Sequence, residues 1–569
     1  MRFINVPFGL LSLPSYEVAS MKSYLVSQGQ KAFVDNVYIK FAEYIGGDTY
    51  RILRTTGLGE MVFATMLSDD IYNNIVNYVS EKLLDYNLNY NVVASKCKAF
   101  IEKYFDNIQN NENIYGFYLY TQQLFTALYF SKIIKSINPS AVVIFMGYNC
   151  QNEMGVGLKK TFDWIDIVIS NNVEENLSAY LKKADVTIHD NLDFLPTPDY
   201  SDFFDTVNEC SSEFVAEYLG QHTLQLEVAR GCFWNKCCFC TYNCNSSAFR
   251  EKSLENIQCD FTNLQKRYDT VEISFSQLAP EKKWKDTLTL VYKQNPALLK
   301  TMSYNFKIET LSNTEDFKLL SQMGVAVLVG TESFSGKYLK MLNKNQRVID
   351  NIFVLKFAER YGIPLYHNML YGFPFETEEM FSETEDVIKY ILHLQPPFDV
   401  EKFRLTYGSD VFMNIEKYGI TAVFPRKEFE GMVLTSEMKK TFIPFFYDFE
   451  SCNKSVASDK WKELVDRWRK KYYIHSTCGM PKRTSLLYAT KNDDVLHIHD
   501  LRFNRYPQLY KFSGIAKSIY EFCDTIKTYE DITNKFSETT SADIENILND
   551  FIVKKVMFNE NDSYLSLSI

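Results

Sequence analysis

The sequence of 569 residues lacks several features that would direct a protein into a membrane or out of the cell. It has no run of 18 or more apolar residues, which excludes the usual form of a membrane-spanning helix. Its first residues, MRFINVPFGLLSLPSYEVAS, lack the small-residue cleavage pattern of a secretory signal peptide. There is no low-complexity segment and no internal repeat, which argues against a repeat architecture. We therefore expect an unprocessed, cytoplasmic protein.

The sequence has fewer positive than negative side chains, so the formal net charge is −10 and the pI is near 5.5. Nucleic acid and anionic lipid are polyanions that gain no long-range attraction to such a surface, so we expect neither nucleic acid nor membrane as a partner. The chain is longer than one hydrophobic core usually organises, and 46% of its residues are hydrophobic. Two large domains and a smaller third are therefore predicted.

Short apolar runs alternate with helical patterns through residues 1–200. Strands are predicted at RFINVPF, NIYGFYLYT, AVVIFMG and DIVIS, and helices at YEVASMKSYLVSQG and LFTALYFSKIIKSI. This alternation is typical of a parallel sheet with crossover helices. The fold class expected is α/β, with a doubly wound, flavodoxin-like (Rossmann-type) sheet whose ligands bind beyond the carboxyl ends of the strands.

After a polar, proline-containing stretch at 191–205, the alternation starts again. Six predicted strands follow at roughly even intervals: HTLQLEVAR, TVEISFSQ, YNFKIET, VAVLVGTES, IPLYHNMLYG and VEKFRLTYG. Six strand–helix units over residues 215–430 predict a partial (β/α)6 barrel, in which residues at the carboxyl ends of the strands carry the chemistry.

The pattern changes over residues 431–569. The stretch EMKKTFIPFFYDFESCNKSVASDKWKELVDRWRKKYY predicts a pair of helices. The last part predicts a small α/β, winged-helix-like module, with a strand at DVLHIHDLR, helices at IAKSIYEFCDTI and SADIENILNDFIVKK, and a hairpin at VMFNENDSYLSLS.

The 12 cysteines are unevenly spread along the chain. Five of them fall in a 13-residue window just after the first predicted barrel strand: Cys232, Cys237, Cys238, Cys240 and Cys244. In a chain of this size, such a group indicates a metal site and not a secreted disulfide framework. The loop after a first barrel strand is also where a barrel would hold a cofactor.

Cys232-x4-Cys237-x2-Cys240 places three thiolates on one short loop, and Fe–S clusters are held by thiolates. Three protein ligands leave one iron of a [4Fe-4S] cluster open, and S-adenosylmethionine (SAM) can occupy it through its amino and carboxylate groups. Gly231 allows a sharp turn after the strand. The ring of Phe239 is placed to stack on adenine.

Other interpretations of the cysteines stay open. A tetrahedral zinc site would use Cys244 or Cys238 as its fourth ligand. Cys237-x2-Cys240-x3-Cys244 is an alternative triple for the cluster. Cys478, in HSTCGMPK, is isolated and is either a buried thiol or part of a second site.

The segment LEVARGCFWNKCCFCTYN, with the later FREKS, resembles the cluster loop of radical SAM enzymes that carry an N-terminal cobalamin-binding domain and mature ribosomally made peptides. The likeness runs almost from end to end. Further matching motifs are YLYTQQLFTALYFSKIIKSINP, FMGYNCQNEMG, FKIETLS, LVGTESFS, HNMLYGFPFETEEMF, HLQPPFDVEKFRLTYGS and DSYLSLSI. The sequence departs from the group in a shorter gap between the first two cysteines, and in NNVEEN where the group usually has a Gly-Glu pair.

The resemblance implies a C-methyltransferase that uses a [4Fe-4S] cluster, SAM and cobalamin to methylate an unactivated carbon of a precursor peptide. A flavodoxin or ferredoxin-type protein would donate the electron. Two other functions stay open. One is a radical SAM enzyme that crosslinks, epimerises or cyclises a peptide without methyl transfer, and the other is a zinc-bearing, non-enzymatic peptide-binding protein.

No Asp-x-His-x-x-Gly motif occurs in the first domain, so no histidine is placed to coordinate cobalt. The implied mode is base-off cobalamin with its lower face against ordinary side chains. The candidate contacts are Tyr120, Gln122 and Gln123, with Pro7 after the first strand and Gly147, Asn149 and Cys150 after the fourth. The alternative is a flavodoxin-like domain that has lost its ligand and only supports the barrel.

Charged residues in otherwise apolar strands are costly unless they are paired or bind a ligand. Lys307, Glu309, Glu332 and Ser333 are therefore assigned to SAM, with a Lys–Glu ion pair inside the barrel as the alternative. Asn368 and Tyr371 are predicted to line the same cavity, and Glu332 and Tyr371 to act in catalysis. The C-terminal module is expected either to recognise a leader peptide by strand addition or to cap the barrel.

Overall fold

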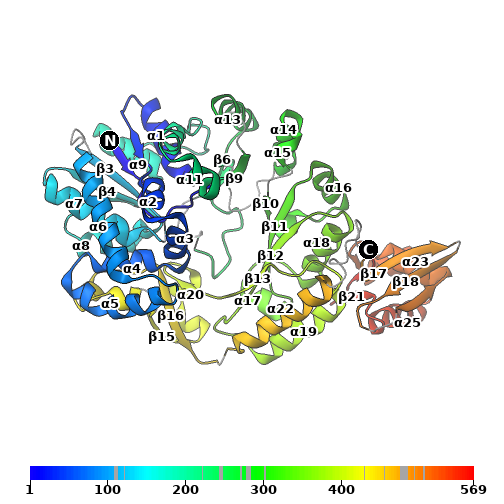
Figure 1. Cartoon of the computed structure of the whole chain (residues 1–569). Coiled ribbons are helices and arrows are strands. Elements are labelled where there is room, and N and C mark those ends of the chain that lie inside the picture. The colour runs from blue at the N-terminus through cyan, green and yellow to red at the C-terminus, as the bar shows by residue number, and fades with distance from the viewer. Residues whose placement is uncertain are drawn as a thin grey trace.

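A computed structural model describes most of the chain (Figure 1). The described residues are 1–107, 113–120, 122–220, 222–241, 248–268, 272–276, 283–299, 303–427, 430–453, 455–473, 485–492, 494–503 and 507–569. No helix within these ranges is long and apolar enough to cross a membrane.

The N-terminal part contains a parallel five-stranded sheet with the order β2-β1-β3-β4-β5. Its strands are β1 (Arg2–Ile4), β2 (Phe33–Asp35), β3 (Ile114–Leu119), β4 (Val142–Gly147) and β5 (Ile167–Ile169). This is the flavodoxin-like order, with its topological switch point between β1 and β3. The predicted doubly wound parallel sheet is confirmed.

Both faces of this sheet are covered by helices. Ile144 and Met146 of β4 pack toward α1 (Tyr16–Ser27) and α9 (Val173–Lys182), whereas Val143 and Phe145 face the core beside α7 (Leu124–Ile137). The helix α8 (Asn152–Thr161) connects β4 to β5. Strand residues therefore alternate between two buried faces, as a doubly wound sheet requires.

Between β2 and β3 the chain inserts five helices that the sequence analysis did not predict. They are α2 (Val37–Ile45), α3 (Gly47–Thr56), α4 (Leu58–Thr65), α5 (Asp69–Leu84) and α6 (Tyr90–Asn107). Their apolar side chains share one core with β3 and α7. A connecting segment then follows, with α10 (Ser201–Asn208), α11 (Ser212–Phe214) and the short helix η2 (Val215–Leu219).

The six predicted barrel strands are all present, and all are parallel to their neighbours. They are β6 (Thr223–Glu227), β9 (Glu272–Ser276), β10 (Ser303–Phe306), β11 (Ala326–Glu332), β12 (Leu365–Tyr371) and β13 (Asp399–Lys402). They form a two-stranded sheet, β6-β9, and a four-stranded sheet, β10-β11-β12-β13. Within the described ranges, no backbone pairing joins the two.

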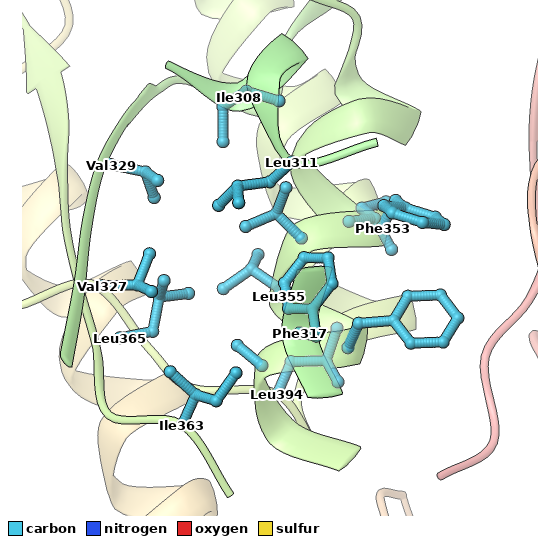
Figure 2. Close-up of a cluster of buried hydrophobic side chains, with 14 of the residues drawn as sticks. Ile308, Leu311, Phe317, Val327, Val329, Phe353, Leu355, Ile363, Leu365 and Leu394 are labelled. Atoms are coloured by element: carbon cyan, nitrogen blue, oxygen red, sulfur yellow. The ribbon is translucent and has the colours of Figure 1, made fainter. Parts of the chain in front are cut away.

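The outer face of the larger sheet packs on helices. The barrel helices are α13 (Leu254–Arg267), α14 (Trp284–Gln294), α15 (Pro296–Leu299), α16 (Thr314–Met323), α17 (Gly336–Met341), α18 (Val348–Arg360) and α19 (Glu378–Ile391). Figure 2 shows Val327 and Leu365 from the strands facing Phe317 of α16 and Phe353 of α18. This buried layer leaves the opposite face of the sheet directed into the barrel.

The segment after the barrel differs from the predicted pair of helices. Only its second half is a long helix, α22 (Ser458–Tyr473), while β16 (Phe446–Ser451) joins β14 (Leu405–Thr406) and β15 (Ile420–Pro425) in an antiparallel sheet. Tyr447 and Phe449 pack on a buried cluster around Cys238. Two aromatic residues spaced by two positions fit a strand, so the helical prediction for this half was wrong.

The C-terminal module contains two antiparallel sheets and three helices. The first sheet is β17 (Leu487–Asn492), β18 (Val495–Asp500) and β19 (Gln508–Phe512). After it come α23 (Gly514–Phe522), β20 (Lys527–Thr528), α24 (Tyr529–Lys535), α25 (Ser541–Val553), β21 (Met557–Glu560) and β22 (Ser563–Ser566). This helix–strand–helix–helix–strand–strand order fits the winged-helix-like interpretation.

Candidate active site

The cysteine loop leaves the barrel after β6 through two short paired strands, β7 (Ala229–Arg230) and β8 (Arg250–Glu251). Gly231, with φ +89°, turns the chain at its start. Cys232, Cys237 and Cys240 are all partly buried. Cys244 and Cys478 lie outside the described residues.

The three thiols share one electrostatic environment. Burial raises the pKa of the Cys237 thiol to about 12, and the neighbouring Cys240 and Cys232 act in the same direction. The ammonium groups of Lys344 and Lys307 oppose this effect. A loop that carries three thiols beside two cations suits a ligand that converts thiols to thiolates.

Cys238 is separated from these three. It is 1% exposed and packs in the cluster of buried residues beneath the loop. Its Sγ donates to the Met341 carbonyl at 3.3 Å, and its backbone NH donates to Leu342 O at 3.2 Å. This placement argues against Cys238 as the fourth ligand of a zinc site.

No group of three or more His, Cys, Asp or Glu side chains in the described part of the chain is already arranged to hold a metal ion. The cysteine trio is therefore recognised by its donor chemistry and by its position after the first barrel strand, and not by a preformed cage. The soft thiolate donors favour an Fe–S cluster or zinc over hard cations.

Lys307 follows β10 and lies against the cysteine loop, with its Nζ 4.4 Å from the centroid of the Trp234 ring. It also pairs with Glu309, so the ion pair considered from the sequence is present. The second oxygen of the Glu309 carboxylate is buried and has no hydrogen-bond partner in the part of the chain that the structure describes. That oxygen remains able to accept a hydrogen bond from a ligand.

Glu332 ends β11 in a left-handed conformation, with φ +57°, beside a shift in the β11–β12 register. Such strain and such bulges are typical of functional sites. Its Oε1 lies 2.6 Å from the Nζ of Lys344. Ser333, in contrast, is 1% exposed, and its Oγ accepts a hydrogen bond from the backbone of Ser335. The geometry thus supports a ligand-binding role for Glu332 more than for the Ser333 hydroxyl.

The inner face of the barrel is set by the alternation of side chains along β12. Asn368 lies on this face and donates from Nδ2 to Glu401 at 2.9 Å. Tyr371 lies on the other face and packs against the outer hydrophobic core. Its predicted catalytic role is therefore not supported by its position.

Sequence reasoning missed other inward-facing residues. Leu328 and Tyr366 are register partners on β11 and β12 and are 40% and 45% exposed, respectively. Asp399 and Glu401 of β13 are exposed on the same side as Asn368 and Leu370, their register partners. The period-two alternation of these strands was the signal that would have assigned them to the inner face.

A cavity of about 450 Å³ lies between the carboxyl edge of the N-terminal sheet and the barrel. The predicted cobalamin contacts Tyr120, Gln122 and Gln123 all line it. The barrel contributes Gln225, Phe275 and Asn305. The remaining lining residues are Asn5, Phe8, Gly9, Leu10, Leu13, Pro14, Ser15, Glu17, Tyr38, Arg54 and Tyr148.

Several polar atoms in the walls of this cavity have no hydrogen-bond partner among the described residues. Gln123 is 1% exposed and uses its Nε2 to donate to Val6 O at 2.6 Å, but no described residue pairs with its Oε1. The same holds, within the described ranges, for the Tyr38 hydroxyl and the Arg54 Nε. Burial raises the pKa of Glu17, whose carboxylate accepts from the Tyr120 hydroxyl. Unpaired buried groups beside a large space fit a polar ligand such as a corrin with amide side chains.

The other predicted cobalamin contacts are placed differently. Pro7, Gly147, Asn149 and Cys150 lie near the strand ends but do not line the cavity. At Gly147, a Cβ would lie 2.5 Å from Leu119 O, so the glycine is needed for close backbone packing. Cys150 is fully buried in the core, which does not support contact with a ligand in the cavity. The Asn149 Oδ1 is buried and accepts no hydrogen bond from a described residue.

Residues 226–388 match the family model described as the Radical SAM superfamily. The matched segment includes the cysteine loop and β9 to β12, and it ends within α19. The barrel is therefore similar to the radical SAM superfamily over this segment. No curated protein matches the chain.

Among solved structures, the radical SAM methyltransferase TsrM from Kitasatospora setae, with cobalamin and a [4Fe-4S] cluster bound, is similar with a TM-score of 0.51 and 13% identity. The match covers 85% of this chain and 92% of that chain, and it supports the fold alone. The cobalamin-dependent SAM radical enzyme OxsB has a TM-score of 0.47 and 13% identity over 73% of this chain. This chain spans only 55% of the OxsB chain.

Proposed function

We propose that this protein is a cobalamin-dependent radical SAM enzyme that methylates an unactivated carbon of a ribosomally made precursor peptide. The observation that carries the proposal is the position of Cys232, Cys237 and Cys240. They lie within the segment similar to the radical SAM superfamily, on a loop next to a flavodoxin-like domain with a large polar cavity at its carboxyl edge.

When bound, the cluster and SAM supply one-electron cleavage of the sulfonium, and cobalamin supplies a methyl group. The three thiolates would hold the cluster, and Lys307 and Lys344 would offset part of the negative charge. Glu332, Glu309 and Asn368 would bind SAM from the barrel side. Tyr120, Gln122 and Gln123 would contact cobalamin from the N-terminal side.

The substrate would enter along the inner face of β11, β12 and β13, where exposed apolar side chains of β11 and β12 lie on the same face as exposed acidic side chains of β13. We propose that a leader segment binds the C-terminal module at β19. Within the described ranges β19 pairs only with β18, and its Gln508, Leu509 and Lys511 are exposed. An open strand edge can accept a peptide as a further strand. A flavodoxin or ferredoxin-type donor and a cytoplasmic location complete the proposal.

The proposal is tested with protein purified without oxygen. We expect iron and acid-labile sulfide, a corrinoid absorption spectrum after reconstitution, and 5′-deoxyadenosine formation with SAM and reductant. Alanine at Cys232, Cys237 or Cys240 should abolish iron binding. Cys259→Ala is the matched control, because it removes an exposed thiol outside the loop.

Mass spectrometry of a precursor peptide then distinguishes the functions. A gain of one methyl unit supports the proposal. Loss of two hydrogens with no bound corrinoid would instead indicate radical peptide chemistry without methyl transfer. Zinc without sulfide would overturn both and favour a peptide-binding protein.

A further inference from the structure

The two stems of the cysteine loop end in opposed arginines. β7 and β8 are antiparallel, and their register places Arg230 directly opposite Arg250. Like charges at facing positions destabilise a strand pair unless other groups neutralise them. The loop can be held closed only if each guanidinium has an acidic partner.

The partner of Arg230 comes from the N-terminal domain. Its Nη1 and Nη2 donate to the two oxygens of Glu174 at 2.9 and 2.8 Å, which is a bidentate pair. Its Nε and Nη2 also donate to Glu227 of β6, each at 2.8 Å. The hydroxyl of Tyr16 on α1 donates to Glu227 at 2.7 Å. Arg230 thus joins the first barrel strand to α9, and Glu227 joins the same strand to α1.

The partner of Arg250 is the next residue of the same helix. Its Nη1 donates to Glu175 at 3.0 Å, and its Nη2 donates to the side-chain oxygen of Asn172 at 3.0 Å. Glu175 and Arg250 are 1% and 6% exposed in their side chains. Water therefore screens this pair very little.

Both glutamates stand in the first turn of α9, which follows β5 at the carboxyl edge of the N-terminal sheet. Acidic side chains are favoured there by the helix dipole. Although burial alone would favour the protonated acid, Arg230 holds the pKa of Glu174 below its usual value. The Glu174 carboxylate is therefore available as a charged partner for Arg230.

We propose that Arg230, Arg250, Glu174 and Glu175 form a latch that positions the cysteine loop against the carboxyl edge of the N-terminal sheet. The four are positioning residues and touch no reacting atom. This inference rests on the proposed function in one respect, since it assigns the latch to alignment of the cluster site with the cobalamin site. The latch itself is a property of the protein alone.

The first test uses hydrogen–deuterium exchange on the protein without cofactors. Glu174→Gln removes one charge but keeps a side chain of similar shape. We expect amides in 228–232 and 248–252 to exchange at least about fivefold faster, because a buried guanidinium left without its partner destabilises the stems. Asp500→Asn is the matched control, since it breaks a fully buried Arg–carboxylate pair in the C-terminal module. It should leave the stems unchanged.

The second test uses the reconstituted enzyme. The Glu174→Gln variant should keep its iron and still release 5′-deoxyadenosine. The amount of methylated product formed per deoxyadenosine should fall roughly tenfold or more, because misplacement of about 1 Å between reacting groups has effects of this size. Arg230→Lys keeps the charge and loses the bidentate geometry, so it should show an intermediate ratio of methylated product to deoxyadenosine. This variant keeps the inference testable if Glu174→Gln misfolds.

The inference is overturned if both variants exchange at the wild-type rate in the stems, or if the product ratio is unchanged while the stems open. If the wild-type protein lacks corrinoid or releases no deoxyadenosine, the proposed function fails, while the exchange result still decides whether the latch exists.

Discussion

The carboxylate of Glu332 lies 2.6 Å from the ammonium of Lys344, and both side chains are largely buried at the carboxyl end of β11. Lys344 also donates to the Gly330 carbonyl at 2.6 Å. The pair holds the carboxylate group of Glu332 in place at the mouth of the barrel, in a residue whose backbone is strained. Glu332 is thus prepared to accept hydrogen bonds from a cationic or hydroxyl-bearing ligand without further rearrangement.

Replacement of Glu332 should therefore weaken SAM binding. We expect Glu332→Gln to raise the SAM concentration needed for half-maximal deoxyadenosine release by about tenfold or more, since a charged hydrogen bond contributes about 1.5–3 kcal/mol. Titration with SAM at fixed reductant measures this change. Glu315→Gln, at an exposed carboxylate paired with Lys318, should have no effect. Equal SAM dependence in both variants would contradict the assignment.

Cys238 should prove structural. Cys238→Ala removes a buried sulfur from the cluster beneath the loop and should lower the free energy of unfolding by about 1–2 kcal/mol, as small truncations in a core do. Iron content should stay at the wild-type level. Denaturant unfolding and metal analysis of the same preparation give the two readouts, and a loss of iron without a loss of stability would return Cys238 to the ligand set.

Gly147 should resist substitution. At φ +102° any side chain is strained, and an added Cβ would also lie 2.5 Å from the Leu119 carbonyl. We expect Gly147→Ala to cost about 2 kcal/mol or more and to reduce the expression of folded protein. Gly29→Ala separates the two causes, because Gly29 also has a positive φ but a Cβ added there would meet no described atom within 4 Å. Similar thermal midpoints for the two variants would refute the clash.

His367 should make stability depend on pH. Burial lowers the pKa of this imidazole from 6.5 to about 4, while its ring nitrogens contact Thr331 and the Gln395 carbonyl. The unfolded chain binds the proton more readily, so this contribution is complete above pH 6.5 and is lost as the pH falls toward 4. Between pH 7 and pH 5 the loss is about 2 kcal/mol.

Urea unfolding at the two pH values checks this prediction. Comparison with His367→Gln removes the contribution of other groups that titrate in the same range. The variant should lose about 2 kcal/mol less than wild type over the interval. Parallel losses in the two proteins would show that the imidazole is not the source.

Much of the fold was predictable because local pattern and tertiary structure agree. The apolar run at 114–119 is a strand, and LFTALYFSKIIKSI is the helix α7. The five-helix insertion was missed although α5 carries a regular apolar stripe, because α2, α3 and α4 follow one another at one-residue intervals and α4 is buried on all sides. The strand β16 was missed because aromatic residues suit either element, and only its pairing with β14 and β15 decides between them.

The candidate site was predicted less evenly. Cys232, Cys237 and Cys240 were predictable from their local spacing, and in the structure all three lie on one loop. The catalytic role of Tyr371 stays a prediction that its position does not support, because proximity to a strand end does not say to which face a side chain points. Glu174 and Glu175 form ion pairs with Arg230 and Arg250, which lie far away in the sequence. No local sequence pattern predicts such a contact.

The helical insertion between β2 and β3 also affects the order in which the N-terminal domain folds. β1 pairs with β3 in the middle of the sheet, yet α2 to α6 must be synthesised between them. Since closing a long segment costs chain entropy before any strand pairing repays it, we expect the inserted helices to collapse first and bring the two strand segments together. The order of synthesis then favours a folding intermediate in which the inserted helices have formed before β3 pairs with β1.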